Sequence, residues 1–313
     1  MRAIGINQFG GPDALEVLDL PEPHAGAGEV RLRVHAATVN PTDTGLRAGL
    51  YGDRPGDHDA PWVPGMDASG EIDEVGDGVE GWQVGDAVVA LVLPTGPHGG
   101  AYADQLVVPA ASVVARPRGA DHVAASTLLM NAMTARLALE AFDLAPGATI
   151  AVTGAAGSFG GYAVQLAKAA GLRVIADAAE KDVQLVRDLG ADEVLPRGDD
   201  IAAHIREIAP DGVDALADGA VMDALVLPAI RDGGALATVR GWDGPSERGI
   251  EVHPVMVFGA AQRTDELQAL ADAASAGVLT LRVAETFPAE EAPAAHRRLE
   301  AGGVRGRIVL DFT

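Results

Sequence analysis

The sequence predicts an α/β protein in which a doubly wound parallel sheet is joined to a mainly β domain. The composition and the predicted secondary structure of the chain change near residue 122. Before that point the chain is rich in glycine and proline and has short apolar runs, and after it predicted strands and helices alternate. Such alternation is typical of a parallel sheet with helices on both faces. A glycine-rich turn at residues 153–161 joins a buried strand to a helix, which supports the same fold class.

Length and composition limit the class of protein. A chain of 313 residues with 48% hydrophobic side chains is long enough for two globular domains. It has no cysteine, which excludes disulfides, thiolate zinc sites and a cysteine nucleophile. The net charge of -22 repels phosphate backbones and argues against nucleic acid as a partner. We see no signal peptide, and the longest apolar run, 87–93, is too short to span a membrane, so we expect a soluble, cytoplasmic protein.

Residues 1–121 are predicted to form an irregular, mainly antiparallel β domain. Residues 30–34 alternate apolar and polar side chains, as a half-buried strand does. Further strands are expected at 71–75, 87–93 and 102–108. The glycines within 76–78 and 84–86 supply turns between them.

The rest of the chain is predicted to alternate between helix and strand. A helix over 124–142 ends before Pro146 and Gly147. Strands are expected at 149–152, 174–176, 193–195, 213–216 and 235–239, and helices at 162–170, 181–189 and 201–208. After Pro254, helices at 265–276 and 292–301 precede a last strand at 307–311.

The glycine-rich turn is the sharpest local signal. The spacing Ala155-x-Gly157-x-x-Gly160 fits the dinucleotide-binding fingerprint, with alanine in place of the first glycine. The fingerprint needs a tight turn, a bare backbone beside the pyrophosphate and a small residue where helix packs on strand. The helix N-terminus then offers N–H groups to the phosphates. We predict that this turn binds a dinucleotide through Ala155, Ala156, Gly157, Ser158, Phe159 and Gly160; the alternative is a tight turn without a ligand.

A rival interpretation uses the same residues. Residues 156–160 differ by one substitution from the Gly-x-Ser-x-Gly nucleophile elbow of hydrolases. A serine hydrolase would use Ser158 with a later aspartate, such as Asp218, and with His253 or His296. The helical run around His296 is a poor place for a loop histidine, which disfavours this interpretation.

Three further positions are predicted to border the dinucleotide. Asp177 lies about 20 residues after Gly157, where an acidic residue holds the ribose hydroxyls. Its alternative is an ordinary loop aspartate. Gly219 follows the strand at 213–216 on a turn of small residues, expected on the ribose side of the crevice. Gly241 begins the loop 241–249, which we expect to border the pocket together with the loop 52–62.

Several motifs, taken in order, resemble one family. They are Pro64-Gly65-Met66-Asp67-Ala68-Ser69-Gly70, the stretch 71–79, Val84-Gly85-Asp86, Gly100-Ala101-Tyr102, the glycine turn followed by 163–168, Leu189-Gly190-Ala191-Asp192, and the stretch 295–310. Together they resemble the medium-chain dehydrogenase/reductase superfamily, in its quinone oxidoreductase (zeta-crystallin-like) branch, over nearly the whole chain. The resemblance implies a GroES-like catalytic domain over 1–121 and 256–313 and a Rossmann domain over 122–255. It also implies an active-site cleft between the domains and a homodimer.

Zinc is not expected. The alcohol dehydrogenase branch of the superfamily uses a cysteine and a His-Glu pair at the positions that match Asn40 and Met66-Asp67. Neither asparagine nor methionine replaces a thiolate or an imidazole as a zinc ligand. The eight histidines are scattered without a ligand spacing, so the sequence predicts no metal site.

The resemblance places Asn40, Tyr51 and Thr134 beside the nicotinamide. Asn40 and Tyr51 can donate hydrogen bonds to a carbonyl oxygen that gains charge during hydride transfer. Tyr51 could instead only shape the pocket, and Asn40 could be a turn side chain before Pro41. For Thr134 the alternative is a helix-interior threonine that bonds back to its own helix.

The function implied is a zinc-free, NADPH-dependent reductase that transfers a hydride to a quinone or to the activated double bond of an enone. The alternatives are an enoyl-thioester reductase, a nucleotide-binding protein with little turnover and, remotely, the serine hydrolase. We expect a small-molecule substrate.

The residues that would choose the cofactor disagree. Asp177 favours NAD(H), because a carboxylate repels a 2′-phosphate. Lys181 and Arg197 favour NADP(H), since two cations would flank that phosphate. They could instead neutralise Glu180 and Asp199. The balance favours NADP(H).

Overall fold

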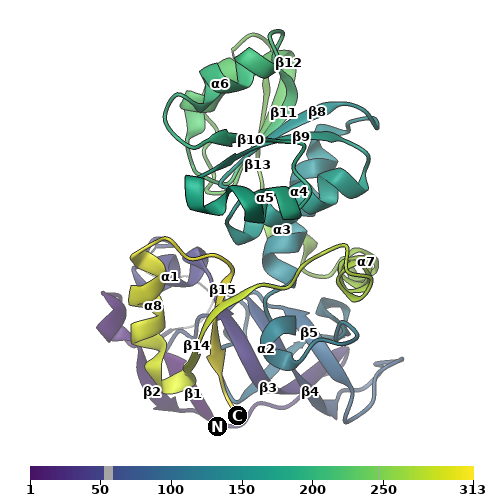
Figure 1. Ribbon diagram of the computed structural model, residues 1–313. Coiled ribbons are helices and arrows are strands. Elements are labelled where there is room, and N and C mark those ends of the chain that lie inside the picture. Colours follow the sequence, from purple (N-terminus) through teal and green to yellow (C-terminus); the bar gives the residue numbers. More distant parts are fainter. Residues whose placement is uncertain (53–58, 246) are drawn as a thin grey trace. The chain divides into compact units, whose positions relative to one another are not determined.

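A computed structural model of the protein describes residues 1–52, 59–245 and 247–313. The chain divides into two compact units, which are described separately. The first unit comprises Met1–Met130, Phe258–Ser275 and Leu281–Thr313, and the second comprises Asn131–Val257 and Ala276–Thr280. Both chain termini therefore belong to the first unit (Figure 1).

The first unit is built on a mainly antiparallel sheet. Its strands are β1 (Arg2–Gly5), β2 (Glu16–Asp19), β3 (Glu29–Val39), β4 (Asp67–Val75), β5 (Ala87–Leu91), β6 (Gln105–Pro109), β7 (Val113–Ala115), β14 (Val283–Pro288) and β15 (Arg307–Asp311). The main sheet runs in the order β14-β15-β3-β4-β5-β7, β6 also pairs with β3, and β1 pairs with β2 in a separate sheet. Only β14 and β15 pair in parallel within this described unit.

The long strand β3 shows why this sheet has one buried face. Val30, Leu32 and Val34 are buried in the core, and the residues between them alternate outward. On the outer face Arg31 donates to Asp73 of β4 at 2.8 Å, so opposite charges pair across the two strands. The predicted alternation at 30–34 is thus the inside and outside of one sheet.

The helices of the first unit are α1 (Pro41–Arg47), α2 (His122–Ala125), α7 (Thr264–Ser275) and α8 (Ala292–Glu300), and α3 (Leu129–Phe142) begins at its end. The expected single helix over 124–142 is wrong, because residues 126–128 interrupt it. The hydroxyls of Ser126 and Thr127 donate to the carbonyls of Val123 and Ala124, at 2.9 and 2.7 Å. These bonds satisfy the last carbonyls of α2 locally and end it. No described helix is long and apolar enough to cross a membrane.

The second unit is a parallel sheet with helices on both faces. Its strands are β8 (Thr149–Thr153), β9 (Arg173–Ala178), β10 (Glu193–Pro196), β11 (Val213–Asp218), β12 (Ile230–Thr238) and β13 (Glu251–Pro254), and its helices include α4 (Ser158–Ala169), α5 (Val183–Asp188) and α6 (Ile201–Ile208). Figure 1 shows α4 and α5 on one side of the sheet and α6 on the other.

The strand order of this sheet is β10-β9-β8-β11-β12-β13. In chain order this is 3-2-1-4-5-6, the order of the dinucleotide-binding doubly wound fold. The chain moves outward from β8 in one direction and then from β11 in the other, so a crevice opens outside the carboxyl ends of these two central strands. The α/β fold class predicted from the sequence is confirmed.

Candidate active site

A cavity of about 170 Å³ lies within the first unit. Its walls are almost entirely apolar. The lining residues are Thr42, Leu46, Tyr51, Met66, Pro94, Thr95 and Phe258. They come from α1, from the segments beside β4 and β5, and from the segment that returns after the second unit.

Tyr51 forms one wall of this cavity and is 42% exposed. It follows α1, and the absence of a side chain at Gly45 leaves room for its phenol. A Cβ at Gly45 would lie 3.3 Å from the Tyr51 hydroxyl. A phenol that is partly in water and partly against an apolar wall can donate to an oxygen of a bound molecule.

Asn40 lies at the start of α1, and its side chain is fully buried. Its Oδ1 accepts from Nη2 of Arg307 at 2.7 Å, and its Nδ2 donates to Oδ2 of Asp67 at 3.1 Å. The same Asp67 oxygen accepts from Arg307 at 3.0 Å, and Thr38 joins the cluster through its hydroxyl. The Asn40 amide therefore belongs to a buried polar network, and one of its two amide hydrogens is committed to Asp67.

Arg307 is the residue of this network that the sequence reasoning missed. It was expected only as the start of the last strand, and it is 4% exposed. An arginine is almost never buried without a partner, so a buried arginine in the final strand implies an acidic partner elsewhere in the core. The sequence alone does not say that this partner is Asp67 on β4.

The donor set around Asn40 does not fit zinc. Met66 offers a thioether, whose sulfur accepts from the Thr42 hydroxyl at 3.0 Å. Asp67 is already paired with the guanidinium of Arg307. Zinc sites are built from thiolate, imidazole and free carboxylate, so this position has the wrong ligands and already holds a positive charge.

A buried series of hydrogen bonds links the two ends of α1 through His296 and Tyr102. Arg47 donates to Nδ1 of His296 at 3.2 Å, Nε2 of His296 faces the Tyr102 hydroxyl at 3.2 Å, and that hydroxyl donates to Asp43 at 3.2 Å. Because His296 accepts at Nδ1, its ring proton is assigned to Nε2. The series thus runs in one direction and ends on the Asp43 carboxyl.

Burial shifts the pKa values of the residues in this hydrogen-bonded series in opposite directions. Burial raises the pKa of Asp43 to about 7, although the backbone N–H groups of Asn40 and Gly65 oppose the rise. Burial, followed by the nearby charge of Arg47, lowers the pKa of His296 to about 3. Burial and then Asp43 raise the pKa of Tyr102 well above its usual value.

In the second unit, the glycine turn between β8 and α4 has the shape that the fingerprint requires. Gly154 has a φ of +65°, and its carbonyl accepts from the Gly157 N–H at 2.9 Å. A Cβ at Gly160 would lie 2.4 Å from the Gly154 oxygen, so the helix packs on the turn only with glycine there. Gly157 occupies the N-cap of α4 and leaves the first N–H groups of that helix without a covering side chain. Ala155 and Phe159 are buried under this turn, and Ala156 and Ser158 complete it.

Asp177 faces this turn. It lies near the end of β9, is 5% exposed, and accepts from the Ala155 N–H at 3.1 Å. Burial raises its pKa, and the backbone N–H groups of Ala155 and Gly154 and the charge of Arg197 oppose that rise. Its carboxylate therefore organises the glycine turn and is turned away from solvent.

Arg197 and Lys181 lie near the same edge of the sheet. Leu195 of β10 pairs with Asp177 of β9, so Arg197 emerges beside the end of β9, where its N–H donates to Ala178 at 3.0 Å. Lys181 lies in a short helical turn at Glu180–Asp182. Both side chains are exposed, and neither forms an ion pair with Glu180 or Asp199 within the described part of the chain.

The remaining predicted positions in the second unit have different surroundings. Gly219 packs against Gly154, whose Cβ would lie 2.8 Å from the Gly219 carbonyl carbon. Gly241 lies in an exposed loop after β12, where an added Cβ would meet nothing within 4 Å. Thr134 is 8% exposed on α3. Residues 53–58 of the predicted loop 52–62 and residue 246 of the loop 241–249 lie outside the described residues.

The hydrolase interpretation lacks its base. Ser158 begins α4 and has no histidine partner among the residues that the structure describes. Asp218 accepts from the N–H groups of Met222 and Asp223, and from the Thr153 hydroxyl at 2.6 Å. His296 belongs to the other unit.

Comparisons with known proteins agree with this geometry. A family profile described as the alcohol dehydrogenase GroES-like domain matches residues 26–118, and one described as a zinc-binding dehydrogenase matches residues 189–310. A quinone oxidoreductase of Pseudomonas aeruginosa is 30% identical over 333 residues, which cover 99% of both chains. The chain belongs to the quinone oxidoreductase branch of the medium-chain dehydrogenase/reductase superfamily.

Other members of the superfamily differ in how far they match. A 2-haloacrylate reductase of Burkholderia is 30% identical, over 99% of this chain and 98% of that protein. The chloroplast envelope quinone oxidoreductase homolog of Arabidopsis thaliana is 36% identical over 203 residues, 62% of this chain, so the chain matches only 60% of that relative's length.

Solved structures resemble the chain over its whole length. The mycobacterial protein Rv1454c complexed with NADPH has a TM-score of 0.86 and 29% identity, over 99% of this chain and 100% of that one. The CurK enoyl reductase has a TM-score of 0.87 and 26% identity, over 99% and 98%.

Proposed function

We propose that this quinone oxidoreductase family member is an NADPH-dependent reductase that transfers a hydride to a quinone or to the activated double bond of an enone, without zinc. The observation that carries the proposal is the cavity in the first unit. Tyr51 and Met66 line its apolar walls, and Met66 stands at a position where the zinc branch has a metal ligand. The relatives named quinone oxidoreductase and 2-haloacrylate reductase support a small, electron-poor substrate.

The second unit fits a nicotinamide dinucleotide. Its glycine turn leaves a bare backbone at Gly157 and free N–H groups at the start of α4, which suit a pyrophosphate. When bound, the dinucleotide supplies the hydride. The chain's own task there is to hold the phosphates at the turn that Asp177 organises, with Gly219 packed behind it, and to present Thr134 from α3.

NADPH is favoured over NADH because the Asp177 carboxylate is already engaged. It accepts from the backbone of the glycine turn, so less of its charge faces a 2′-phosphate. Arg197 and Lys181 remain exposed at that edge and can bind a phosphate dianion. The resemblance to a structure complexed with NADPH supports this preference.

The chain's part in the reaction is to orient the substrate and to stabilise developing negative charge. Reduction of a quinone or an enone places charge on a carbonyl oxygen, and a donor aimed at that oxygen lowers the barrier. We assign that role to Tyr51; the amide of Asn40 is held by Arg307 and Asp67 and fixes the start of α1. Solvent then protonates the product, so no strong acid or base is needed in the cavity.

We further propose that residues 1–121 and 256–313 form the catalytic domain and residues 122–255 the dinucleotide-binding domain of a cytoplasmic homodimer. The family resemblance supports this arrangement. Sedimentation velocity of the purified chain tests the dimer, which would give a single species of twice the 31.9 kDa chain mass.

One screen tests the activity. NADPH oxidation is followed with simple quinones, with enones and with enoyl thioesters, and each is repeated with NADH. We expect steady consumption of NADPH with a quinone or an enone. Turnover with enoyl thioesters alone would favour the second candidate, which the similarity to the CurK enoyl reductase supports. NADPH binding without turnover on any acceptor would indicate a nucleotide-binding protein.

A further inference from the structure

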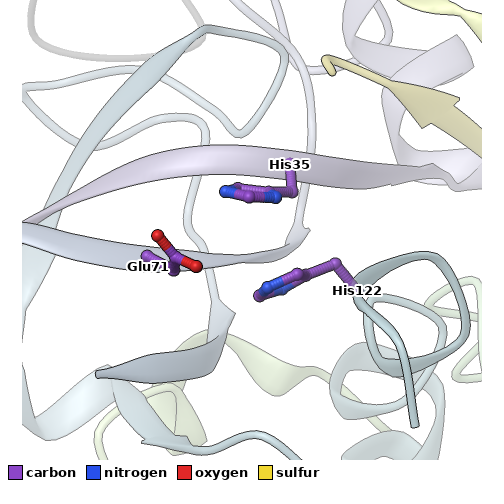
Figure 2. Close-up of side chains that lie close together, drawn as sticks. All are labelled: His35, Glu71 and His122. Carbon is purple, nitrogen blue, oxygen red and sulfur yellow. The ribbon is translucent and has the colours of Figure 1, made fainter. Parts of the chain in front are cut away.

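Three side chains that could hold a metal ion converge on the outer face of the first unit. His35 comes from β3, Glu71 from β4 and His122 from the first turn of α2. One possible ligand atom from each lies within 4.8 Å of the others, and all three residues are half-buried. Figure 2 shows the two imidazoles and the carboxylate pointing into one common space. Spacing along the sequence does not indicate this group, because each member comes from a different element.

The fold builds this convergence. Arg33 of β3 pairs with Glu71 of β4, and the register shifts between Val34 and Ala36. His35 therefore lies at a β-bulge, and bulges re-aim side chains next to functional sites. His122 is placed by its helix cap, because the Asp121 carboxylate accepts from the Ala124 N–H at 2.8 Å.

The hydrogen bonds around His122 leave one ring nitrogen with a free lone pair. The Ser69 hydroxyl donates to the Val88 carbonyl at 3.0 Å, so its oxygen accepts from Nδ1 of His122 at 2.8 Å. The proton of the neutral ring therefore lies on Nδ1, and Nε2 carries the lone pair. A histidine held in this way, with its other nitrogen donating to a neighbour, is arranged like a metal ligand.

The other two members also have unused capacity. Nε2 of His35 is buried and has no hydrogen-bond partner among the described residues. Glu71 pairs with Arg33 through Oε2, which leaves Oε1 outside that contact. The Arg33 side chain is 61% exposed, whereas Arg307 beside Asp67 is buried, so solvent screens the charge of Arg33 and the pair can open. The two imidazole rings lie with their centroids 4.3 Å apart. A cation bound at the nitrogen edges of both rings would give the orphaned His35 nitrogen a partner.

We propose that His35, Glu71 and His122 form a binding site for a late first-row divalent cation, for which zinc is the test ion. Two imidazoles and one carboxylate, with water in the fourth position, are a common zinc ligand set. Imidazole favours zinc, nickel and copper over magnesium and calcium. Ligand atoms of a tetrahedral zinc lie about 3.3 Å apart at the usual bond lengths. Those of the three side chains lie within 4.8 Å of one another, so binding requires the side chains to rotate until the ligand atoms meet.

This site departs from the expectation that the chain holds no metal, and it is separate from the proposed reaction. Glu71 lies beyond Asp67 on β4. Four residues of strand span about 13 Å. A cation here would tie β3, β4 and α2 together and would have no part in hydride transfer. The proposal therefore does not depend on the proposed function.

The test is a zinc titration of the untagged protein after treatment with a chelator and dialysis. Calorimetry should show one zinc per chain. His35→Gln, Glu71→Gln and His122→Gln should each weaken binding by more than about 100-fold, beyond the 10- to 100-fold effect of losing an outer-shell partner, which Ser69→Ala should show. His24→Gln is the matched control. It removes a histidine that contacts a carboxylate, Glu74, at 3.2 Å, without a third ligand, and should leave binding unchanged.

A readout on the unaltered chain covers the case in which a variant fails to fold. Addition of zinc should shift the imidazole NMR signals of two of the eight histidines and leave the others in place. Cobalt should give the visible absorption of a tetrahedral ion in the wild type and not in His122→Gln. No zinc binding to the wild type, or equal binding by all three ligand variants, would overturn the proposal.

Discussion

Tyr51 and Asn40 were predicted as a pair, and the structure gives them different surroundings. Asn40 is fully buried, and both ends of its amide are held by Arg307 and Asp67. Tyr51 lines the cavity and is partly exposed. At the residue scale, the structure therefore favours Tyr51 as the group that meets the substrate and Asn40 as the group that fixes the start of α1.

Replacing Tyr51 by phenylalanine tests this assignment. If the hydroxyl donates to the developing oxyanion, Tyr51→Phe should lower kcat by about 10- to 1000-fold. The dissociation constant for NADPH should not change, which serves as the control for folding. Unchanged turnover with every acceptor would show that Tyr51 only shapes the wall.

The buried Asp43 predicts a pH dependence of stability. Its pKa is raised from 3.8 to about 7, so its contribution to the free energy of unfolding is fully present below pH 3.8 and is lost as the pH rises toward 7. His296 has the opposite sign: its pKa falls from 6.5 to about 3, so its contribution is fully present above pH 6.5 and is lost as the pH falls toward 3. Between about pH 4.5 and 6.5, acidification therefore raises the free energy of unfolding through Asp43 and lowers it through His296, and the two effects oppose each other.

Asp43→Asn should remove the part of this pH dependence that comes from Asp43. Relative to the wild type, the variant should lose about 1.4 kcal/mol of unfolding free energy for each pH unit of acidification over that range. Urea unfolding at several pH values measures this difference. A curve for Asp43→Asn that runs parallel to that of the wild type would contradict the assigned pKa.

Cofactor preference is decided by Asp177 and Arg197. Arg197→Ala should lower kcat/KM with NADPH and leave that with NADH nearly unchanged, because the guanidinium is expected to bind only the 2′-phosphate. Asp177→Ala should weaken binding of both cofactors, since its carboxylate holds the Ala155 N–H of the glycine turn. A wild type that prefers NADH, with the preference reversed in Asp177→Ala, would show that the carboxylate outweighs the cations.

At the scale of elements, the turn between β8 and α4 depends on glycine at one position above all. An added Cβ at Gly160 would lie 2.4 Å from the Gly154 oxygen and 2.7 Å from the Ala155 Cα, and both atoms are backbone. The helix would have to move away from the strand. This would disturb the N–H groups that we expect to bind phosphate.

Gly160→Ala should therefore destabilise the protein by about 1–3 kcal/mol and weaken NADPH binding. Thermal unfolding and fluorescence titration measure the two effects. Gly11→Ala is the control, because a Cβ at Gly11 meets nothing within 4 Å and its φ of -69° suits alanine. Wild-type stability and affinity in Gly160→Ala would show that the turn adapts at no cost.

At the scale of the whole molecule, we expect hydride transfer to be independent of bound metal. The position that holds zinc in the alcohol dehydrogenase branch contains Asn40, Met66 and an Asp67 already paired with Arg307. After removal of metal by a chelator, steady-state turnover with NADPH should be unchanged, at a temperature where the protein stays folded. Added zinc should not raise it, even if the site at His35 fills. Loss of turnover to the chelator, restored by zinc, would contradict the proposal.

The sequence by itself determined the fold class and the glycine turn. Period-two alternation at 30–34, strand–helix alternation after residue 122 and the spacing of Gly157 and Gly160 are local patterns, and each follows from neighbours along the chain. Short edge elements escaped the same reasoning. β13 and β14 have weak patterns, and their half-exposed side chains give no periodic signal.

Only the tertiary structure decided which distant residues meet. The pairing of Arg307 with Asp67, the chain from Arg47 through His296 and Tyr102 to Asp43, and the convergence of His35, Glu71 and His122 all join different elements. Hydrogen bonds and metal ligation need atoms within a few ångströms, and sequence spacing fixes such distances only within one helix or strand. Strand register, a β-bulge and burial set them between elements, and these arise when the whole sheet forms.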